Sequence, residues 1–184
     1  MKIMVGLTGA SGIAYGVRLI EIMSEKKIDV FSSITPAAKE ILRHETKYTV
    51  EYIKGMSKYY ESNDFSAPFV SGSARIDACV IIPASMKTVS AIANGFTDNI
   101  ITRCADVVLK EGKKLIVVPR ETPLNMIHLR NLLILSKNNV TVLPAMPAFY
   151  QKPKSVEDFI DFIVGKVLDN LGIENDLYER WGQI

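Results

Sequence analysis

Apolar residues follow two repeating patterns along the chain. Short apolar runs occupy residues 2–5, 78–83, 114–118 and 140–143, and residues 28–34 (IDVFSSI) predict a further strand with polar positions. Such runs are typical of strands that are buried on both faces of a parallel sheet. Elsewhere the apolar residues recur every three or four positions, which predicts helices over 12–23, 37–43, 88–93, 99–110, 124–135 and 155–171.

The order of these elements predicts the fold class. Strands that alternate with helices imply right-handed crossovers, and therefore an α/β fold: a doubly wound, Rossmann-like parallel sheet with helices on both faces. We expect a single domain over residues 1–184, long enough to bury a substantial core. Residues 47–69 have the weakest pattern and indicate a helix plus a surface loop. The tail, 174–184, is expected to pack on the body or on a neighbouring subunit.

A turn of small residues, 6–12 (GLTGASG), joins the first predicted strand to the first helix. Backbone N–H groups and the positive end of a helix surround such a turn, which suits a phosphate. The glycine spacing matches neither the dinucleotide fingerprint nor the Walker loop. The hydroxyls of Thr8 and Ser11 can donate to anionic oxygens, although Ser11 can equally be only the N-cap of the helix. We predict a phosphate-binding turn, with a purely structural joint as the alternative.

Polar and small residues follow every predicted strand, at the edge where such sheets bind ligands. After the first turn these segments are Thr35, 84–88 (ASMKT), 119–123 (PRETP) and 144–150 (PAMPAFY). Arg120 and Glu121 can form a surface ion pair, but their position directly after a buried strand favours a functional role. The sequence therefore predicts a binding site built from several strand ends.

Composition narrows the classes of partner. The chain is 48% hydrophobic and 23% charged, which indicates a globular protein, and its net charge of +2 shows no basic stripe for nucleic acid. No apolar run approaches the ~20 residues of a membrane span, and glycines interrupt the first run as no signal peptide would. Cys79 and Cys104 lie inside a predicted strand and a predicted helix, which argues against a disulfide framework. His44 and His128 are far apart in the sequence and have no metal-ligand spacing. We expect a cytoplasmic, metal-free protein, with His128 in the core or at an interface.

The strand ends, considered together, resemble those of the flavin prenyltransferases, the UbiX-like family of FMN-binding flavoproteins. The matching segments are 6–12 (GLTGASG), 85–107 (SMKTVSAIANGFTDNIITRCADV), 115–129 (LIVVPRETPLNMIHL), 147–153 (PAFYQKP), 164–169 (VGKVLD) and 180–182 (RWG). They cover nearly the whole chain. The family usually has arginine where Lys166 stands and an aromatic residue where Ala74 stands. The first departure affects how a phosphate is held.

The resemblance implies an activity and its partners. Such proteins bind reduced FMN and attach the dimethylallyl group of dimethylallyl phosphate to its N5 and C6. The prenylated FMN then serves a UbiD-type decarboxylase. The resemblance also implies a homo-oligomer, often a dodecamer, with sites at subunit contacts.

The resemblance further implies the roles of individual residues. The residues that contact FMN would be Gly9, Ala10, Ser11, Thr35, Ser85, Met86, Lys87, Thr88, Arg103 and Arg120. Those that contact the prenyl phosphate would be Tyr150, Lys166 and Arg120. Positions linked to catalysis are Ser11, Glu45, Lys110 and Glu121. Without the resemblance, Lys110 is an ordinary helix-end charge and Arg103 can be a solvated one.

Elementary chemistry agrees with this set of residue types. When the allylic C–O bond breaks, positive charge develops on carbon and negative charge on phosphate. Fixed cations and a phenol donor stabilise the phosphate, and the electron-rich flavin and apolar or aromatic walls shelter the cation. The candidate donors are Arg120, Lys166, Lys110 and Tyr150. Lysine at 166 supplies charge without the bidentate fork of arginine. Glu121 or the released phosphate can accept the proton that leaves C6, and Ser11 can relay a proton at N5. Because side chains alone can neutralise a monophosphate, no metal is expected.

Two other functions stay open. An FMN-dependent cysteine decarboxylase would share the fold, but those enzymes carry a PASANT-type loop and a PxMNxxMW-type segment. This chain has 83–88 (PASMKT) and 123–126 (PLNM) instead. The second alternative is a non-catalytic flavin carrier or decarboxylase subunit. The sequence also leaves open whether the donor is a mono- or a diphosphate, and which decarboxylase receives the product.

Overall fold

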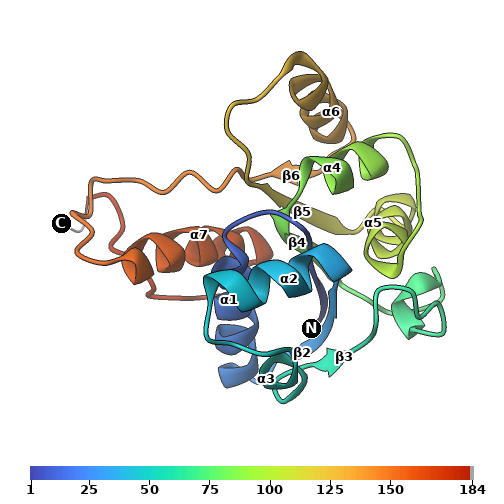
Figure 1. The fold of residues 1–184 in the computed structure, drawn as a ribbon, viewed down its shortest axis with the longest axis horizontal. Helices are drawn as coiled ribbons and strands as arrows, with labels where there is room; N and C mark the ends of the chain where they lie inside the picture. Colours follow the sequence, from blue (N-terminus) through green and yellow to red (C-terminus); the bar gives the residue numbers. More distant parts are fainter. Residues whose placement is uncertain (183–184) are drawn as a thin grey trace.

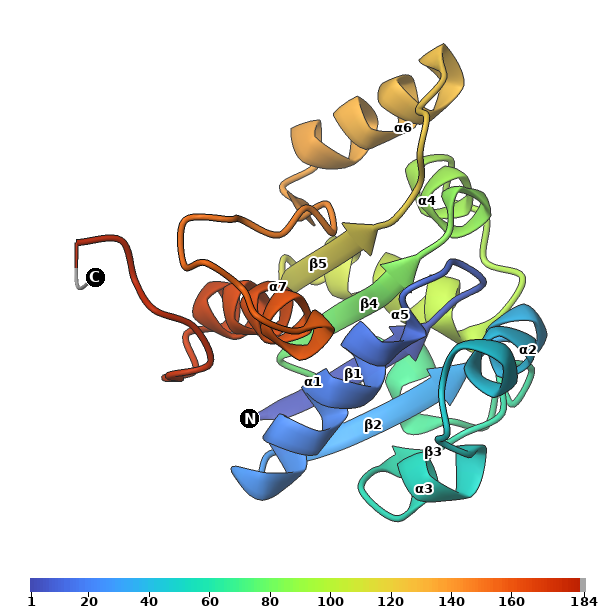
Figure 2. The ribbon, with the colours of Figure 1, turned by 60° about the vertical axis from the view of Figure 1, so that its left-hand side comes forward.

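The sheet is parallel throughout, with its switch point between two central strands. The computed structural model describes residues 1–182. Its strands are β1 (Lys2–Leu7), β2 (Asp29–Ile34), β3 (Lys58–Tyr59), β4 (Ala78–Ala84), β5 (Lys114–Pro119) and β6 (Thr141–Val142). They lie in the order β3-β2-β1-β4-β5-β6, and every neighbouring pair is parallel. The chain therefore reverses its direction of winding at β1 and β4, and all the carboxyl ends share one edge (Figure 2).

Helices cover both faces of this sheet (Figure 1). They are α1 (Ile13–Glu25), α2 (Pro36–Glu45), α3 (Val50–Lys54), α4 (Met86–Ala93), α5 (Ile100–Lys110), α6 (Met126–Lys137) and α7 (Val156–Leu171), with a 3-10 turn η1 (Pro68–Val70). The first core contains residues of α1, α2, α3 and α7, and the second contains residues of α4 and α5. The predicted fold class, a doubly wound Rossmann-like sheet, is confirmed. In the described part of the chain, no helix has the length and apolar character that crossing a membrane requires.

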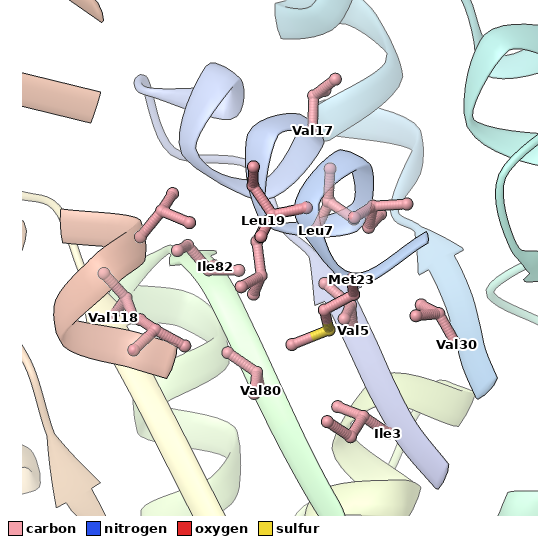
Figure 3. Packing of buried hydrophobic residues seen from close by; sticks show 14 of the residues in the cluster. Ile3, Val5, Leu7, Val17, Leu19, Met23, Val30, Val80, Ile82 and Val118 are labelled. Carbon is pink, nitrogen blue, oxygen red and sulfur yellow. The ribbon is translucent and has the colours of Figure 1, made fainter. Parts of the chain in front are cut away.

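Side chains alternate between these two cores along each central strand. In β1, Ile3, Val5 and Leu7 belong to the first core, whereas Met4 belongs to the second. Figure 3 shows the β1 side chains of the first core packed among residues of α1 and β4. Since both faces are covered, polar side chains would be desolvated on either one. This double burial explains the nearly unbroken apolar runs of the sequence.

Most predicted helices begin at the expected residues because a side chain caps each start. Thr35 accepts the Ala38 N–H at 3.3 Å, with Pro36 as the first helical residue of α2. Ser155 and Asp158 form a reciprocal capping box at α7. The alternative role of Ser11 as the cap of α1 is wrong, because the cap is Gly12, with φ of 92°, a conformation that favours glycine.

Two other expectations need correction. Residues 47–69 contain the expected helix, α3, but also the short strand β3, whose Lys58 and Tyr59 form no apolar run. His128 is a cap and not a core residue. It lies in the first turn of α6, where its backbone N–H donates to Asn125 at 2.9 Å and its ring bonds back to Asn125. The sequence spacing misled because the fully buried positions of α6 are Asn131 and Leu135.

Candidate active site at the carboxyl edge

The start of α1 is already bound to a carboxylate. Glu45, the last residue of α2, accepts the N–H of Gly12 at 2.8 Å and that of Ile13 at 3.3 Å. Its negative charge also compensates the positive end of the helix. A phosphate would have to displace this carboxylate to use the same N–H groups. The predicted phosphate-binding turn therefore lacks its two expected helical donors.

The Thr8 hydroxyl serves a structural bond between two strand ends. Its side chain is 1% exposed, donates to the Pro83 carbonyl at 2.9 Å and accepts the Ser85 N–H at 2.8 Å. The hydroxyl proton is thus committed to a carbonyl, and the expectation that it faces an anion is wrong. Instead, Thr8 ties the end of β1 to the end of β4 at the switch point.

A cavity of about 510 Å³ opens beside this junction. Its walls come from the turns after β1, β2, β4 and β5, and from the start of α5. Predicted FMN and catalytic residues among its lining are Gly9, Thr35, Ser85, Met86, Lys87, Thr88 and Glu121. A volume of this size is usual for small-molecule sites. Seven predicted site residues are therefore brought together by four separate segments of the chain.

The start of α4 offers free backbone donors at this cavity. Ser85 caps the helix by accepting the Thr88 N–H at 3.3 Å, and its own N–H goes to Thr8. Because the first N–H groups of a helix have no intrahelical acceptor, the hydrogen bonds of the described residues leave those of Met86 and Lys87 for a ligand. The Lys87 ammonium lies 3.4 Å from Asp98 and is largely exposed. This helix end suits an anion better than that of α1.

Gly9 and Arg120 shape the turn on the β1 side of the cavity. A Cβ at Gly9 would lie 2.8 Å from the Ala37 Cβ, so only glycine allows this approach to α2. Arg120 donates from Nε to the Ser11 carbonyl at 3.2 Å and so joins the end of β5 to the turn. Burial raises the pKa of the nearby Tyr15 phenol, and the Arg120 guanidinium opposes that shift.

The residues flanking Arg120 and Ser11 also have defined places. Glu121 accepts the Thr122 N–H at 3.1 Å and lines the cavity. Among the described residues, the ion pairs include none between Arg120 and Glu121, so the surface-pair alternative is wrong. Ser11 is exposed on the turn, whereas its neighbour Ala10 is buried.

Tyr150 and Lys166 meet in a second group, the C-terminal aromatic cluster, which consists of Tyr150, Phe162, Tyr178 and Trp181. The Lys166 ammonium lies 6.0 Å from the centre of the Tyr178 ring. Tyr150 packs edge-on against Phe162 and Trp181, with ring centres 6.1 and 5.4 Å apart. Trp181, expected to be packed, is 79% exposed. Residues 183 and 184 of the tail lie outside the described residues.

This cluster lies away from the cavity. The Asn170 carbonyl, at the end of α7, accepts a bond from Lys114, the first residue of β5. The end of α7 is thus at the amino edge of the sheet, and Lys166 is one turn before Asn170. Figure 2 accordingly shows the C-terminal segment on the side opposite the strand arrowheads. Neither Tyr150 nor Lys166 lines the cavity.

Arg103 and Lys110 are also separate from the cavity within one chain. Arg103 donates to the Val70 carbonyl at 3.0 Å and to Asp106 at 2.7 Å. Lys110, at the end of α5, pairs with Glu111 at 2.7 Å, four residues before the start of β5 and therefore at the amino edge. Their roles at the flavin stay predictions.

Metal and thiol chemistry have little support in the described residues. Over 1–182, no group of three His, Cys, Asp or Glu side chains could hold a metal ion. Cys79 and Cys104 are free and buried in the second core. Cys104 is thus an apolar filler, as the sequence indicates.

Known proteins resemble this chain over its full length. The family model Flavoprotein matches residues 1–168. Flavin prenyltransferase UbiX of Methanocaldococcus jannaschii is 50% identical, over 100% of both chains. AnUbiX (PadA1), solved in complex with FMN and dimethylallyl pyrophosphate, superposes with a TM-score of 0.96 at 38% identity, covering 98% of this chain and 97% of its own. A dodecameric FMN-dependent UbiX-like decarboxylase from Escherichia coli O157:H7 superposes with a TM-score of 0.96 at 41% identity, covering 98% and 99%. This chain belongs to the UbiX-like family of flavin prenyltransferases, within the flavoproteins.

Proposed function

We propose that the protein binds reduced FMN in the cavity at the switch point and attaches the dimethylallyl group of dimethylallyl phosphate to N5 and C6 of the flavin. The product, prenylated FMN, would serve a UbiD-type decarboxylase. The observation that carries this proposal is the gathering of Gly9, Thr35 and residues 85–88, all matched to the family, around one cavity. The full-length likeness to a relative solved with FMN and dimethylallyl pyrophosphate supports it.

The residues present fit a flavin mononucleotide. The free N–H groups of Met86 and Lys87 and the positive end of α4 would bind its phosphate, with Ser85 and Thr88 hydroxyls beside them. Gly9 would keep the turn close to Ala37 of α2 on the cavity wall. Arg120, held against Ser11, would lie near the ring system. When bound, the reduced flavin supplies the electron-rich N5 and C6 that receive the dimethylallyl group.

The chain's own residues would assist the departure of phosphate. As the allylic C–O bond breaks, its electron pair goes to the phosphate oxygen, where Arg120, Lys166 and the Tyr150 phenol would stabilise the added charge. Glu121, on the cavity wall, would accept the proton that leaves C6. Ser11 would relay the proton at N5.

The active site would be completed between copies of the chain. Lys166 lies toward the amino edge of the sheet, Tyr150 lies outside the cavity, and Lys110 lies at the amino edge on the opposite face. One chain therefore cannot direct all of them to its own cavity. Exposed apolar side chains on α6 also favour a partner, since Met126 is 77% exposed and Ile127 68%. A homo-oligomer is the expected state, and the dodecamer of the Escherichia coli relative supports that size.

Product analysis tests the reaction. Purified protein is incubated without oxygen with reduced FMN and dimethylallyl phosphate. The expected result is a flavin heavier by one dimethylallyl unit and release of one equivalent of phosphate. A parallel reaction with dimethylallyl diphosphate identifies the preferred donor. Unchanged flavin with no released phosphate would defeat the proposal. Decarboxylation of a cysteine-ended peptide would favour the cysteine decarboxylase, and reversible FMN binding alone would favour a carrier.

Substitution of Lys166 tests the site assignment. Lys166→Ala should weaken the use of dimethylallyl phosphate and leave most FMN affinity intact, because Lys166 lies outside the cavity of its own chain. Steady-state kinetics and FMN titration measure the two effects separately. Equal losses of both would make the assigned role wrong.

A further inference from the structure

A carboxylate on α7 fastens the C-terminal segment to the helix. Asp169 accepts the Tyr178 phenol at Oδ2, 2.5 Å away, and the Asn175 amide at Oδ1, 2.9 Å away. Arg180 adds a two-pronged contact, with Nη2 2.8 Å from Oδ1 and Nη1 3.1 Å from Oδ2. One side chain thus receives four hydrogen bonds from residues 175–180. Charge-assisted, bidentate bonds of this kind fix geometry as well as proximity.

The helix surface is shaped to receive Tyr178. Gly165 precedes Asp169 by four residues and therefore lies on the same face of α7. A Cβ at Gly165 would lie 2.5 Å from Tyr178 Cδ1, so any larger residue would push the ring away. Glycine in a helix interior costs about 1 kcal/mol relative to alanine. The close contact with Tyr178 gives a physical reason for glycine at this position.

Once held, Tyr178 lies beside Lys166 directly and beside Tyr150 through Phe162. Its ring packs against Phe162 with centres 5.0 Å apart, and Phe162 in turn packs against Tyr150. Its face also lies 6.0 Å from the Lys166 ammonium, within the range of a cation–π attraction. Because a lysine stem is flexible, an aromatic wall that limits its rotamers should pre-orient the charge.

The ionisation of the pair agrees with this arrangement. Burial alone would raise the pKa of Asp169, but the bonds from Arg180, Tyr178 and Asn175 outweigh burial and lower that pKa to about 2. Burial, followed by the bond to Asp169, raises the pKa of Tyr178 to about 12. The carboxylate therefore stays charged and the phenol stays a donor at neutral pH.

We propose that Asp169 and Tyr178 are positioning residues for prenyl-phosphate use: Asp169 fixes the segment 175–180 on α7, and Tyr178 in turn holds Lys166 and Tyr150 in place. This inference rests on the proposed function of Lys166 and Tyr150. Neither Asp169 nor Tyr178 need touch the substrate. The two residues act through the groups that do.

The test compares four variants with Lys166→Ala. Asp169→Asn removes the charge, and Tyr178→Phe removes the phenol while keeping the ring. Each has a matched control. Asp161→Asn removes another carboxylate of α7 that binds an arginine. Its partner is Arg18 of α1, which contacts Asp161 at 2.7 and 3.2 Å. Tyr52→Phe removes a phenol that also donates to a carboxylate, that of Glu21, at 2.8 Å.

The readouts are the KM for dimethylallyl phosphate, kcat and the FMN dissociation constant. For Asp169→Asn and Tyr178→Phe, we expect the KM to rise about tenfold, which corresponds to about 1.4 kcal/mol. FMN affinity should stay within about twofold of wild type. The controls should change neither. A double variant, Lys166→Ala with Tyr178→Phe, should raise the KM no further than Lys166→Ala alone, because both changes remove one unit.

Separate results identify which idea fails. If Lys166→Ala leaves the KM unchanged, the role proposed for Lys166 is wrong, and this inference is overturned with it. If Lys166→Ala raises the KM while Asp169→Asn and Tyr178→Phe behave like their controls, only the inference is overturned. Parallel losses of FMN affinity and prenyl-phosphate use in Asp169→Asn would also overturn it, since they would indicate general support of the fold.

Discussion

Replacement of Thr8 by valine should weaken both the fold and the flavin site. Valine has nearly the same shape but lacks the hydroxyl that joins Pro83 and Ser85. The Pro83 carbonyl would keep one bond, because it also accepts the Thr8 N–H at 3.2 Å. The Ser85 N–H would lose its acceptor. The start of α4 would then no longer be tied to Thr8, whereas the end of β4 would keep the backbone bond from the Thr8 N–H.

The size of the effect follows from these two bonds. A buried N–H left without an acceptor costs about 1–3 kcal/mol, and the lost hydroxyl bond about 1 kcal/mol more. The added methyl group returns about 0.8 kcal/mol through burial. We expect Thr8→Val to lower the free energy of unfolding by about 1–3 kcal/mol. For a chain of this size, each kcal/mol lowers Tm by about 2–4 °C.

The functional effect should exceed that of instability alone. Because Ser85 caps the helix whose first residues, Met86 and Lys87, line the cavity, a loosened Ser85 should raise the FMN dissociation constant about tenfold. FMN titration, done well below the variant's Tm, measures this value.

Two further variants distinguish the effect of losing the Thr8 hydroxyl from the effects of the methyl group and of a threonine-to-valine change elsewhere in the sheet. Thr8→Ser keeps the hydroxyl and should bind FMN nearly as wild type does. Thr141→Val alters a threonine on the edge strand β6 and serves as the matched control. If Thr8→Val and Thr8→Ser bound FMN equally well, a positioning role for the Thr8 hydroxyl would be refuted.

Three other measurements test the packing and the charges. Gly16→Ala places a Cβ 2.4 Å from the Ile82 carbonyl, so overpacking of about 1–3 kcal/mol should exceed the helix-propensity gain. The urea midpoint of Gly16→Ala should therefore fall, whereas that of Gly55→Ala, where the nearest atom is 3.4 Å away, should not. Glu45→Ala removes the acceptor at the start of α1 and should cost about 1–2 kcal/mol in thermal unfolding, with a smaller loss for Glu45→Gln; equal stability of all three proteins would contradict that capping role. The pKa of Asp169 is lowered from 3.8 to about 2, so its contribution to the free energy of unfolding should be complete above about pH 5 and disappear as pH falls toward 2. After discounting for solvent screening, that contribution amounts to about 1 kcal/mol. Urea unfolding at several pH values should show this acid-dependent loss in the wild type and not in Asp169→Asn.

Local sequence signals were sufficient for most of the fold. The central strands were predictable because burial on both faces leaves continuous apolar runs. Helix starts were predictable where a single side chain caps its own helix, as Thr35 does. The strand β3 could not be predicted, because two residues that pair with the edge of β2 are too few to show an apolar or alternating pattern. The core alternative for His128 is wrong because helical spacing does not reveal how little of α6 faces the core, whereas the interface alternative stays a prediction.

The candidate site was predictable only where its parts are local. The turns after the strands were found since the carboxyl edge of a parallel sheet gathers them. The contacts that decide which donors are free join distant residues: Thr8 reaches Ser85, and Gly12 reaches Glu45. Nothing in the spacing of the sequence distinguishes such a threonine or glutamate from a ligand-binding one. The tie between Asp169 and Arg180 was missed for the same reason.

The contrast between two helix starts accounts for the kind of nucleotide that the site should prefer. In dinucleotide-binding sheets, the first helix binds the pyrophosphate through its N-terminus. Here Glu45 already satisfies Gly12 and Ile13 at that position, and its charge would repel a second anion. The start of α4, on the other side of the switch point, keeps two free N–H groups. One open anion site beside one filled by a carboxylate suits a mononucleotide with a single phosphate.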